Sequence, residues 1–140
     1  MILGIDAANI RADGGLVHLV EILGAAQPAE SGFTKVVVWG GRSTLNQVND
    51  RPWLVKSHQI QLDQRLPVRI WWQHFKLPKL ARLAACDLLF VPGGSCWTNF
   101  RPMVAFSQNV LPFERKELSR FGWSWMTLKL KLLRWVQSRT

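Results

Sequence analysis

The chain has 140 residues, 48% of them hydrophobic and 19% charged, with two cysteines and a formal net charge of +9. This composition excludes an intrinsically disordered chain and a disulfide-rich scaffold, and no apolar run approaches the ~20 residues of a membrane-spanning helix. We expect one globular domain over residues 1–140, with an anionic partner such as phosphate, nucleic acid or lipid headgroups.

The amino-terminal run MILGIDAANI carries Asp6 and lacks the basic residues of a signal peptide. Cys86 and Cys96 do not form a CxxC pair. Both features predict a reduced, cytoplasmic protein. The positive charge adds a hypothesis of peripheral association with the inner face of the membrane.

Short apolar runs alternate with segments of helical period, which predicts a parallel sheet with helices on both faces, a Rossmann-like α/β fold. Five runs are expected to be strands: Ile2–Ile5, Lys35–Trp39, Leu54–Lys56, Leu88–Val91 and Met103–Phe106. Helices are expected after Gly14-Gly15, over Arg42–Val48, over Leu66–Ala85 with a break near Leu77 caused by Pro78, and over Trp125–Gln137.

Glycine-rich and polar residues follow three of the predicted strands. Gly14-Gly15 precedes the first helix, where free backbone N–H groups could hold an anion or where glycine could serve a tight turn; both interpretations stay open. Pro92-Gly93-Gly94-Ser95 follows the fourth strand, and Ser107-Gln108-Asn109 with Glu114 follows the fifth. Because ligands bind at the carboxyl ends of parallel strands, these residues form the predicted binding site.

Two other functions can be compared with this pattern. A dinucleotide site would need GxGxxG after the first strand and an acidic residue near the end of the second, and both are absent. Trp71-Trp72, flanked by basic residues, is compatible with single-stranded nucleic-acid stacking, although packing of a crossover helix on the sheet is the preferred interpretation.

The runs ILGIDAANIRADGGLVHLVEIL, FTKVVVWGGRSTLN, RPWLVK and LLFVPGGS–NFRPMVAFSQNVLPFE resemble, in this order, the amino-terminal half of family 4-type glycosyltransferases. The resemblance covers nearly the whole chain. It implies one half of a GT-B fold, in which this domain holds a glycan or lipid-linked acceptor. A second domain of such enzymes binds the nucleotide-sugar and carries a Glu-x7-Glu motif, and the reaction needs no metal or other cofactor.

Carried over by position, Gly14-Gly15 matches the family's glycine-rich loop facing the donor phosphates. Ser107-Gln108-Asn109 matches a position where many members have a histidine, so Gln108 leaves the acid–base role there unassigned. No Glu-x7-Glu motif occurs in these residues. We therefore expect a hexosyltransferase-type domain that lacks its donor domain and is inactive alone, and no catalytic residue is assigned.

The last predicted helix has an apolar side formed by Trp125, Leu128, Leu132, Trp135 and Val136. In a βα alternation this helix would lead into another strand, so its apolar side predicts self-association or a missing partner. Two alternatives to the enzyme remain: a non-catalytic Rossmann-like binding protein, and a basic, tryptophan-rich module for membranes or nucleic acid.

Overall fold

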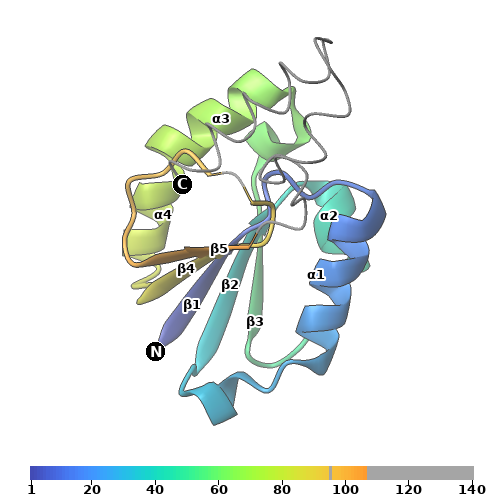
Figure 1. The fold of residues 1–140 in the computed structure, drawn as a ribbon, viewed down its shortest axis with the longest axis vertical. Helices are drawn as coiled ribbons and strands as arrows, with labels where there is room; N and C mark the ends of the chain where they lie inside the picture. Colours follow the sequence, from blue (N-terminus) through green and yellow to red (C-terminus); the bar gives the residue numbers. More distant parts are fainter. Residues whose placement is uncertain (95, 107–140) are drawn as a thin grey trace, which may run out of the picture.

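One five-stranded parallel sheet, in the order β3-β2-β1-β4-β5, forms the centre of the computed structural model (Figure 1). The structure describes residues 1–94 and 96–106, apart from the side chain of Asp13. The strands are β1 (Ile2–Asp6), β2 (Lys35–Gly40), β3 (Leu54–His58), β4 (Leu88–Val91) and β5 (Met103–Ala105). The predicted parallel sheet is confirmed, with strand ends that differ from the prediction by at most two residues.

Helices cover both faces of this sheet, as predicted. In Figure 1, α1 (Asp13–Ala25) and α2 (Arg42–Gln47) lie on one face, and α3 (Leu66–Phe75) and α4 (Leu77–Leu83) lie on the other. Two single-turn 3-10 helices, Pro28–Ser31 and Ile60–Asp63, complete the connections. The arrangement is a three-layer, Rossmann-like α/β fold.

Each face of the sheet has its own core because successive side chains of a strand point to opposite faces. Val36 and Val38 of β2 pack in a buried cluster that includes Leu19 of α1. Val37 and Trp39 of the same strand belong to the opposite cluster, with Trp72, Leu77 and Ala81 of α3 and α4. The uninterrupted apolar run of β2 therefore serves both layers.

The break predicted near Leu77 is confirmed at Lys76, the residue between α3 and α4. Pro78 occupies the first turn of α4, where a missing N–H group does not disturb the helix. The two adjacent tryptophans have separate environments: Trp72 is fully buried, and Trp71 is 47% exposed. Packing of the crossover helix on the sheet therefore accounts for Trp72 but not for Trp71.

The prediction for Gly14 and Gly15 was wrong in one respect. Helix α1 begins at Asp13, so both glycines lie in its first turn and not in a loop before it. Neither has the positive φ that favours glycine, and a Cβ atom at either position would meet nothing within 4 Å. A tight turn therefore does not account for this glycine pair.

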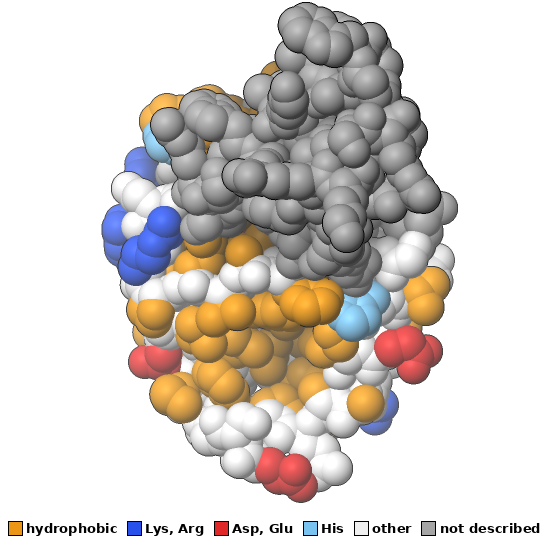
Figure 2. Space-filling model, viewed as in Figure 1, with side chains coloured by type: hydrophobic (Ala, Val, Ile, Leu, Met, Phe, Trp, Pro, Cys, Tyr) orange, Lys and Arg blue, Asp and Glu red, His pale blue; other side chains and the backbone are white. Residues whose placement is uncertain are grey.

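The face of the sheet that α1 covers is less well covered over β4 and β5. Val104 of β5 is 51% exposed, and Phe90, its neighbour on β4, is only partly buried. Figure 2 shows apolar side chains gathered on this side of the molecule. The predicted helix at Trp125–Gln137, with its apolar side, lies outside the described residues.

Candidate functional site

The topology places a binding site where the strand order reverses. From β1 the chain proceeds outward to β2 and β3, and it then returns to β4 on the other side of β1. The carboxyl ends of β1 and β4 are therefore the topological switch point of the sheet, where open α/β folds bind ligands. The loop that leads from β1 to α1 and the residues that follow β4 flank this point.

A buried carboxyl group connects the segments around the switch point. Asp6, at the end of β1, is 1% exposed. Its Oδ1 accepts a hydrogen bond from the Ala8 N–H at 2.9 Å, and its Oδ2 accepts from Gln73 Nε2 of α3 at 2.6 Å and from the Cys96 thiol at 3.2 Å. Three parts of the chain, far apart in sequence, thus meet at one side chain.

Burial is the largest cause of the pKa shifts of Asp6 and Cys96 in this cluster. It raises the pKa of Asp6 above the ordinary 3.8, although the Ala8, Cys96 and Gln73 hydrogen bonds act in the opposite direction. Burial and the neighbouring Asp6 also raise the pKa of Cys96, so its thiol stays protonated and donates. Such a thiol is a poor nucleophile, and the cluster is structural support for the loops above it.

The glycine pair after β4 brings two loops into contact. A Cβ atom at Gly93 would lie 3.2 Å from the Cβ of Asn9, in the loop after β1. Gly94 is buried and has φ +72°, a conformation that glycine adopts without strain. Both predicted residues are therefore at the switch point, where Gly93 allows the close approach of the β1 and β4 loops and Gly94 allows the turn after β4.

Two guanidinium groups lie on the loop between β1 and α1. Arg69 Nη1, from α3, donates to the Ala8 carbonyl at 2.8 Å and to Asn9 Oδ1 at 3.3 Å. Arg11, two residues before α1, donates from Nη2 to the Asp63 carbonyl at 3.1 Å and from Nη1 to the Gln64 carbonyl at 3.5 Å. These hydrogen bonds fix both cations against neutral oxygens.

Among the described side chains, no carboxylate compensates the charge of these arginines. Neither forms an ion pair with any carboxylate whose side chain the structure describes. The pKa of Arg69 is lowered, first by burial and then by the positive charge of Arg11 nearby. In addition, Arg69 Nε is buried and has no hydrogen-bond partner among the described residues. An anion bound here would relieve the repulsion and could accept hydrogen bonds from guanidinium groups.

Helix α1 begins immediately beyond Arg11, so its first turn adds backbone donors to the same region. The residue before the helix, Ala12, has no side chain that could cap the free N–H groups. Apart from the chain neighbours and the backbone of α1 itself, no described atom lies within 4 Å of where a Cβ would stand at Gly14 or Gly15. An incoming anionic group could therefore approach the backbone closely.

A second polar cluster lies at the carboxyl ends of β2 and β3. Asp63 Oδ2 is 2.6 Å from His58 Nε2, and its Oδ1 accepts from the Arg42 N–H at 2.7 Å. These hydrogen bonds, with His58 as the largest cause, lower the pKa of Asp63. Glycine at position 41 leaves room for the Asp63 carboxylate at the Arg42 N–H, because a Cβ atom at Gly41 would lie 2.7 Å from Asp63 Oδ1.

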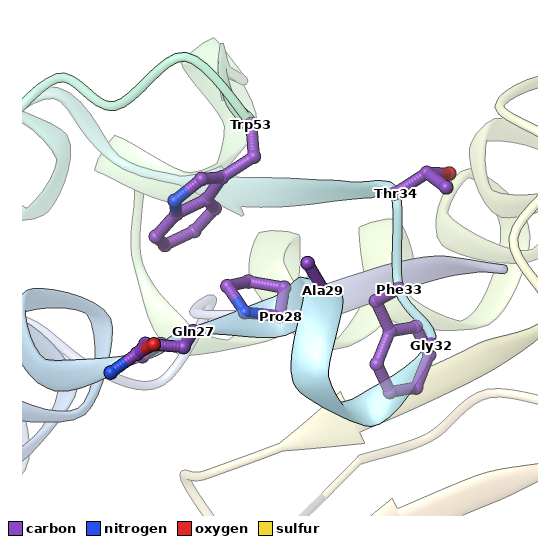
Figure 3. Close-up of a pocket in the computed structure, with 8 residues that line it drawn as sticks. Gln27, Pro28, Ala29, Gly32, Phe33, Thr34 and Trp53 are labelled. Carbon is purple, nitrogen blue, oxygen red and sulfur yellow. The ribbon is translucent and has the colours of Figure 1, made fainter.

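The opposite end of the sheet has an open hollow of about 570 Å³ (Figure 3). In Figure 3 the ring of Trp53 points towards Pro28 and Ala29, and Phe33 lies on the far side of the short helix. The lining residues are Ala26, Gln27, Pro28, Ala29, Gly32, Phe33, Thr34 and Trp53. No charged side chain belongs to this set, and it lies before the strands begin, so it does not fit the anionic ligand that the sequence predicts.

Of the eight predicted site residues, the structure places Gly93 and Gly94 at the switch point and Gly14 and Gly15 in the adjoining helix turn. The other four lie outside the described residues: Ser107, Gln108, Asn109 and Glu114. Sequence reasoning missed Asp6, Arg11, Arg69 and Gln73. A basic residue just before a predicted helix start could have indicated Arg11, whereas α3 carries Arg69 and Gln73 to the site from more than sixty positions away.

Three further features of the molecule bear on the class of site. In the part of the chain that the structure describes, no three His, Cys, Asp or Glu side chains gather as a metal site would require. Within the same residues, no helix is both long and apolar enough to cross a bilayer. Cys86 and Cys96 are free thiols.

The fold and the switch point define the chain as a Rossmann-like α/β domain with a cationic candidate site. In comparisons with known proteins, no family model, no curated protein and no solved structure matches the chain.

Proposed function

We propose that this chain is the acceptor-side domain of a family 4-type GT-B glycosyltransferase, which transfers a sugar from a nucleotide-sugar to a glycan or lipid-linked acceptor. One observation carries the proposal. The cations Arg11 and Arg69, without a described carboxylate partner, hold the loop that leads from β1 into the first turn of α1, at the switch point of a parallel sheet. The motif resemblance described above points to the same location.

The chemistry of sugar transfer matches this arrangement. A departing nucleoside diphosphate develops negative charge that must be stabilised by preorganised donors. The guanidinium groups are held in place by carbonyl oxygens, and the N–H groups of α1 are fixed by the helix, so neither has to reorganise. In the proposal, these groups contact the diphosphate of the donor from the acceptor side of the reaction.

The acceptor itself is assigned to the adjoining loops. The turn at Gly93-Gly94 presents backbone groups beside Asn9, and a sugar hydroxyl can exchange hydrogen bonds with such groups. Ser107, Gln108, Asn109 and Glu114 follow β5 in the sequence and remain proposed acceptor ligands. No side chain is assigned as acid, base or nucleophile.

The test is a titration of the isotope-labelled chain, followed by amide and arginine Nε NMR signals. The ligands are inorganic pyrophosphate, a panel of nucleotide-sugars and neutral oligosaccharides. We expect pyrophosphate and nucleotide-sugars to shift the signals of Gly14, Gly15, Arg11 and Arg69, and to leave Ala29 in the hollow unchanged. Shifts confined to the hollow, or none with any anionic ligand, would contradict the proposed site.

A transfer assay separates the enzyme from a non-catalytic binding protein. Labelled nucleotide-sugars are incubated with glycan or lipid-linked acceptors and the purified chain, alone and joined to a donor-binding domain of the GT-B class. We expect turnover only with the joined protein, because in this family the second domain binds the nucleotide. Binding without turnover in either form would favour the non-catalytic alternative, and turnover by the 140 residues alone would contradict the proposed division of labour.

A further inference from the structure

Helix α3 exposes several apolar side chains and turns two polar ones, Arg69 and Gln73, towards the protein, whereas its Trp72 is buried. Val68, Trp71 and Phe75 are 38%, 47% and 52% exposed. They recur at intervals of three and four residues and therefore lie on one side of the helix. Gln73 on the opposite side is fully buried at Asp6, and Arg69 is directed into the candidate site. A surface helix of a globular protein normally has the reverse distribution, so the outer side of α3 is a candidate contact surface.

Aromatic side chains form a continuous group on this surface. The rings of Trp71 and Phe75 lie 5.8 Å apart, and the His74 ring meets Phe75 edge-on at 4.6 Å. His74 Nδ1 is 3.1 Å from the Trp97 carbonyl, which brings the 39% exposed Trp97 beside the end of α3. Leu83, at the end of α4, is the most exposed large apolar side chain described, at 84%.

The charged residues on α3, on α4 and between them are of one sign. Between Asp63 and Asp87 the sequence has no acidic residue. Exposed basic side chains occur before, between and within the two helices: Arg65, Lys76, Lys79 and Arg82. An apolar, aromatic surface flanked by exposed basic side chains is complementary to an anionic lipid surface, where rings enter the interface and cations meet headgroups.

We propose that the outer surface of α3 and α4, named the α3–α4 surface, docks on an anionic membrane. Helix α3 has 10 residues and α4 has 7, so they would lie on the bilayer without crossing it. The occupant is a lipid surface and not a nucleic acid for two reasons. Aliphatic side chains such as Val68 and Leu83 are exposed with the rings, and Trp71 and Phe75 pack against each other instead of presenting two free faces for base stacking.

This proposal goes beyond the proposed function and does not depend on it. The candidate site is built from the loops at the carboxyl ends of β1 and β4, whereas the docking surface is built from the outer side of α3 and α4. Arg69 and Gln73 on the inner side of α3 link the two regions. A docked α3 would therefore hold the candidate site close to the membrane surface.

Vesicle flotation of the full chain tests the proposal. We expect the protein to float with vesicles of phosphatidylcholine containing phosphatidylglycerol, to float weakly with phosphatidylcholine alone, and to be released by salt. The variant K79E/R82E should lower partitioning by at least about tenfold, since each near-surface cation contributes about fivefold. The control K35E/R51E changes two exposed cations outside the α3–α4 surface and should lower partitioning onto the vesicles much less.

A second variant tests the apolar part of the surface. Trp71→Ser with Phe75→Ser should lower partitioning by about tenfold, because half-exposed rings lose their burial in the interface. The matched control is Val17→Ser with Ile60→Ser, which removes two apolar side chains exposed at 61% and 66% elsewhere. Circular dichroism of each variant checks that the fold is retained, and only folded variants are compared.

Several results would overturn the proposal. These are absence of flotation, equal flotation with neutral and anionic vesicles, or equal losses in the surface variants and their controls. Anisotropy with a labelled single-stranded oligonucleotide and sedimentation of the free chain complete the test. If the surface variants abolish oligonucleotide binding or self-association while vesicle binding is absent, the surface belongs to that other partner.

Discussion

The two ends of the sheet are held together in different ways. At the amino end, backbone groups predominate: the Thr34 N–H donates to the Met1 carbonyl at 2.8 Å, and the Val36 N–H donates to the Trp53 carbonyl at 2.9 Å. Any sequence that forms these strands can make such contacts. The hollow beside them is lined by uncharged residues and lacks a buried polar network.

At the carboxyl end, buried side chains add long-range connections to the backbone hydrogen bonds. Gln73 reaches Asp6 from 67 positions away, and Arg69 reaches the Ala8 carbonyl from 61 positions away. These polar groups contribute little to strand formation, and burying them is unfavourable unless they are hydrogen-bonded. The difference indicates that the amino end mainly closes the fold, whereas the carboxyl end holds loops in a defined arrangement.

Two tryptophan substitutions test this contrast, and one of them has the largest effect that we expect on the free energy of unfolding. Trp72 is fully buried beneath the carboxyl end, with Nε1 3.4 Å from Gln59 Oε1, whereas Trp53 is only partly buried beside the hollow. Trp72→Ala should lower the free energy of unfolding by about 3–5 kcal/mol. Trp53→Ala should lower it by about 1 kcal/mol. Urea unfolding measures both, and equal losses would remove the contrast between the two ends.

The buried carboxyl group gives a smaller, pH-dependent effect. Because burial raises the pKa of Asp6, its contribution to stability is fully present below the ordinary pKa of 3.8 and is lost as the pH rises through the folded-state pKa. Asp6→Asn removes this titration. The amide of Gln73, whose Oε1 has no described partner, can rotate to accept from the new side chain.

We therefore expect Asp6→Asn to be more stable than the wild type at mildly alkaline pH, and to lose this advantage as the pH falls towards 3.8. Thermal unfolding over this pH range is the measurement. The control is Asp50→Asn, since the side chain of Asp50 is 91% exposed and forms its ion pair among the described residues with Lys56 at the surface. An Asp6→Asn profile parallel to that of the wild type would show that Asp6 does not titrate as burial requires.

Much of the fold was predictable because its signals are local. The run KVVVW has β-branched and aromatic residues throughout, which a strand covered on both faces requires, and Pro78 marks the boundary of two helices. The sequence predicts that α1 begins after Gly15, because Gly14 and Gly15 are poor helix formers, whereas the helix begins at Asp13. The structure keeps them in the helix, so the loop before it is shorter than predicted.

The candidate site was predictable only in part, for a physical reason. Gly93 and Gly94 could be predicted because they directly follow an apolar run, and strand ends meet at one edge of a parallel sheet. Arg69 and Gln73 could not, because they lie on a crossover helix whose rotation about its axis decides which residues face the site. The sequence pattern favoured burial of its apolar residues, which is correct for Trp72, whereas Trp71 is exposed and the polar Gln73 is buried.

The most direct test of the central claim, an anion site at the first turn of α1, is a comparison of three glycines in one helix. A Cβ atom at Gly14, Gly15 or Gly24 meets nothing within 4 Å, so alanine fits at each and should raise stability by up to about 1 kcal/mol. Only Gly14 and Gly15 lie in the first turn of α1, which begins two residues after Arg11 in the chain. We predict that Gly14→Ala with Gly15→Ala weakens pyrophosphate binding, measured by calorimetry, by about tenfold, a change of about 1.4 kcal/mol. Gly24→Ala should leave binding unchanged, and unchanged binding in the double variant would contradict the account.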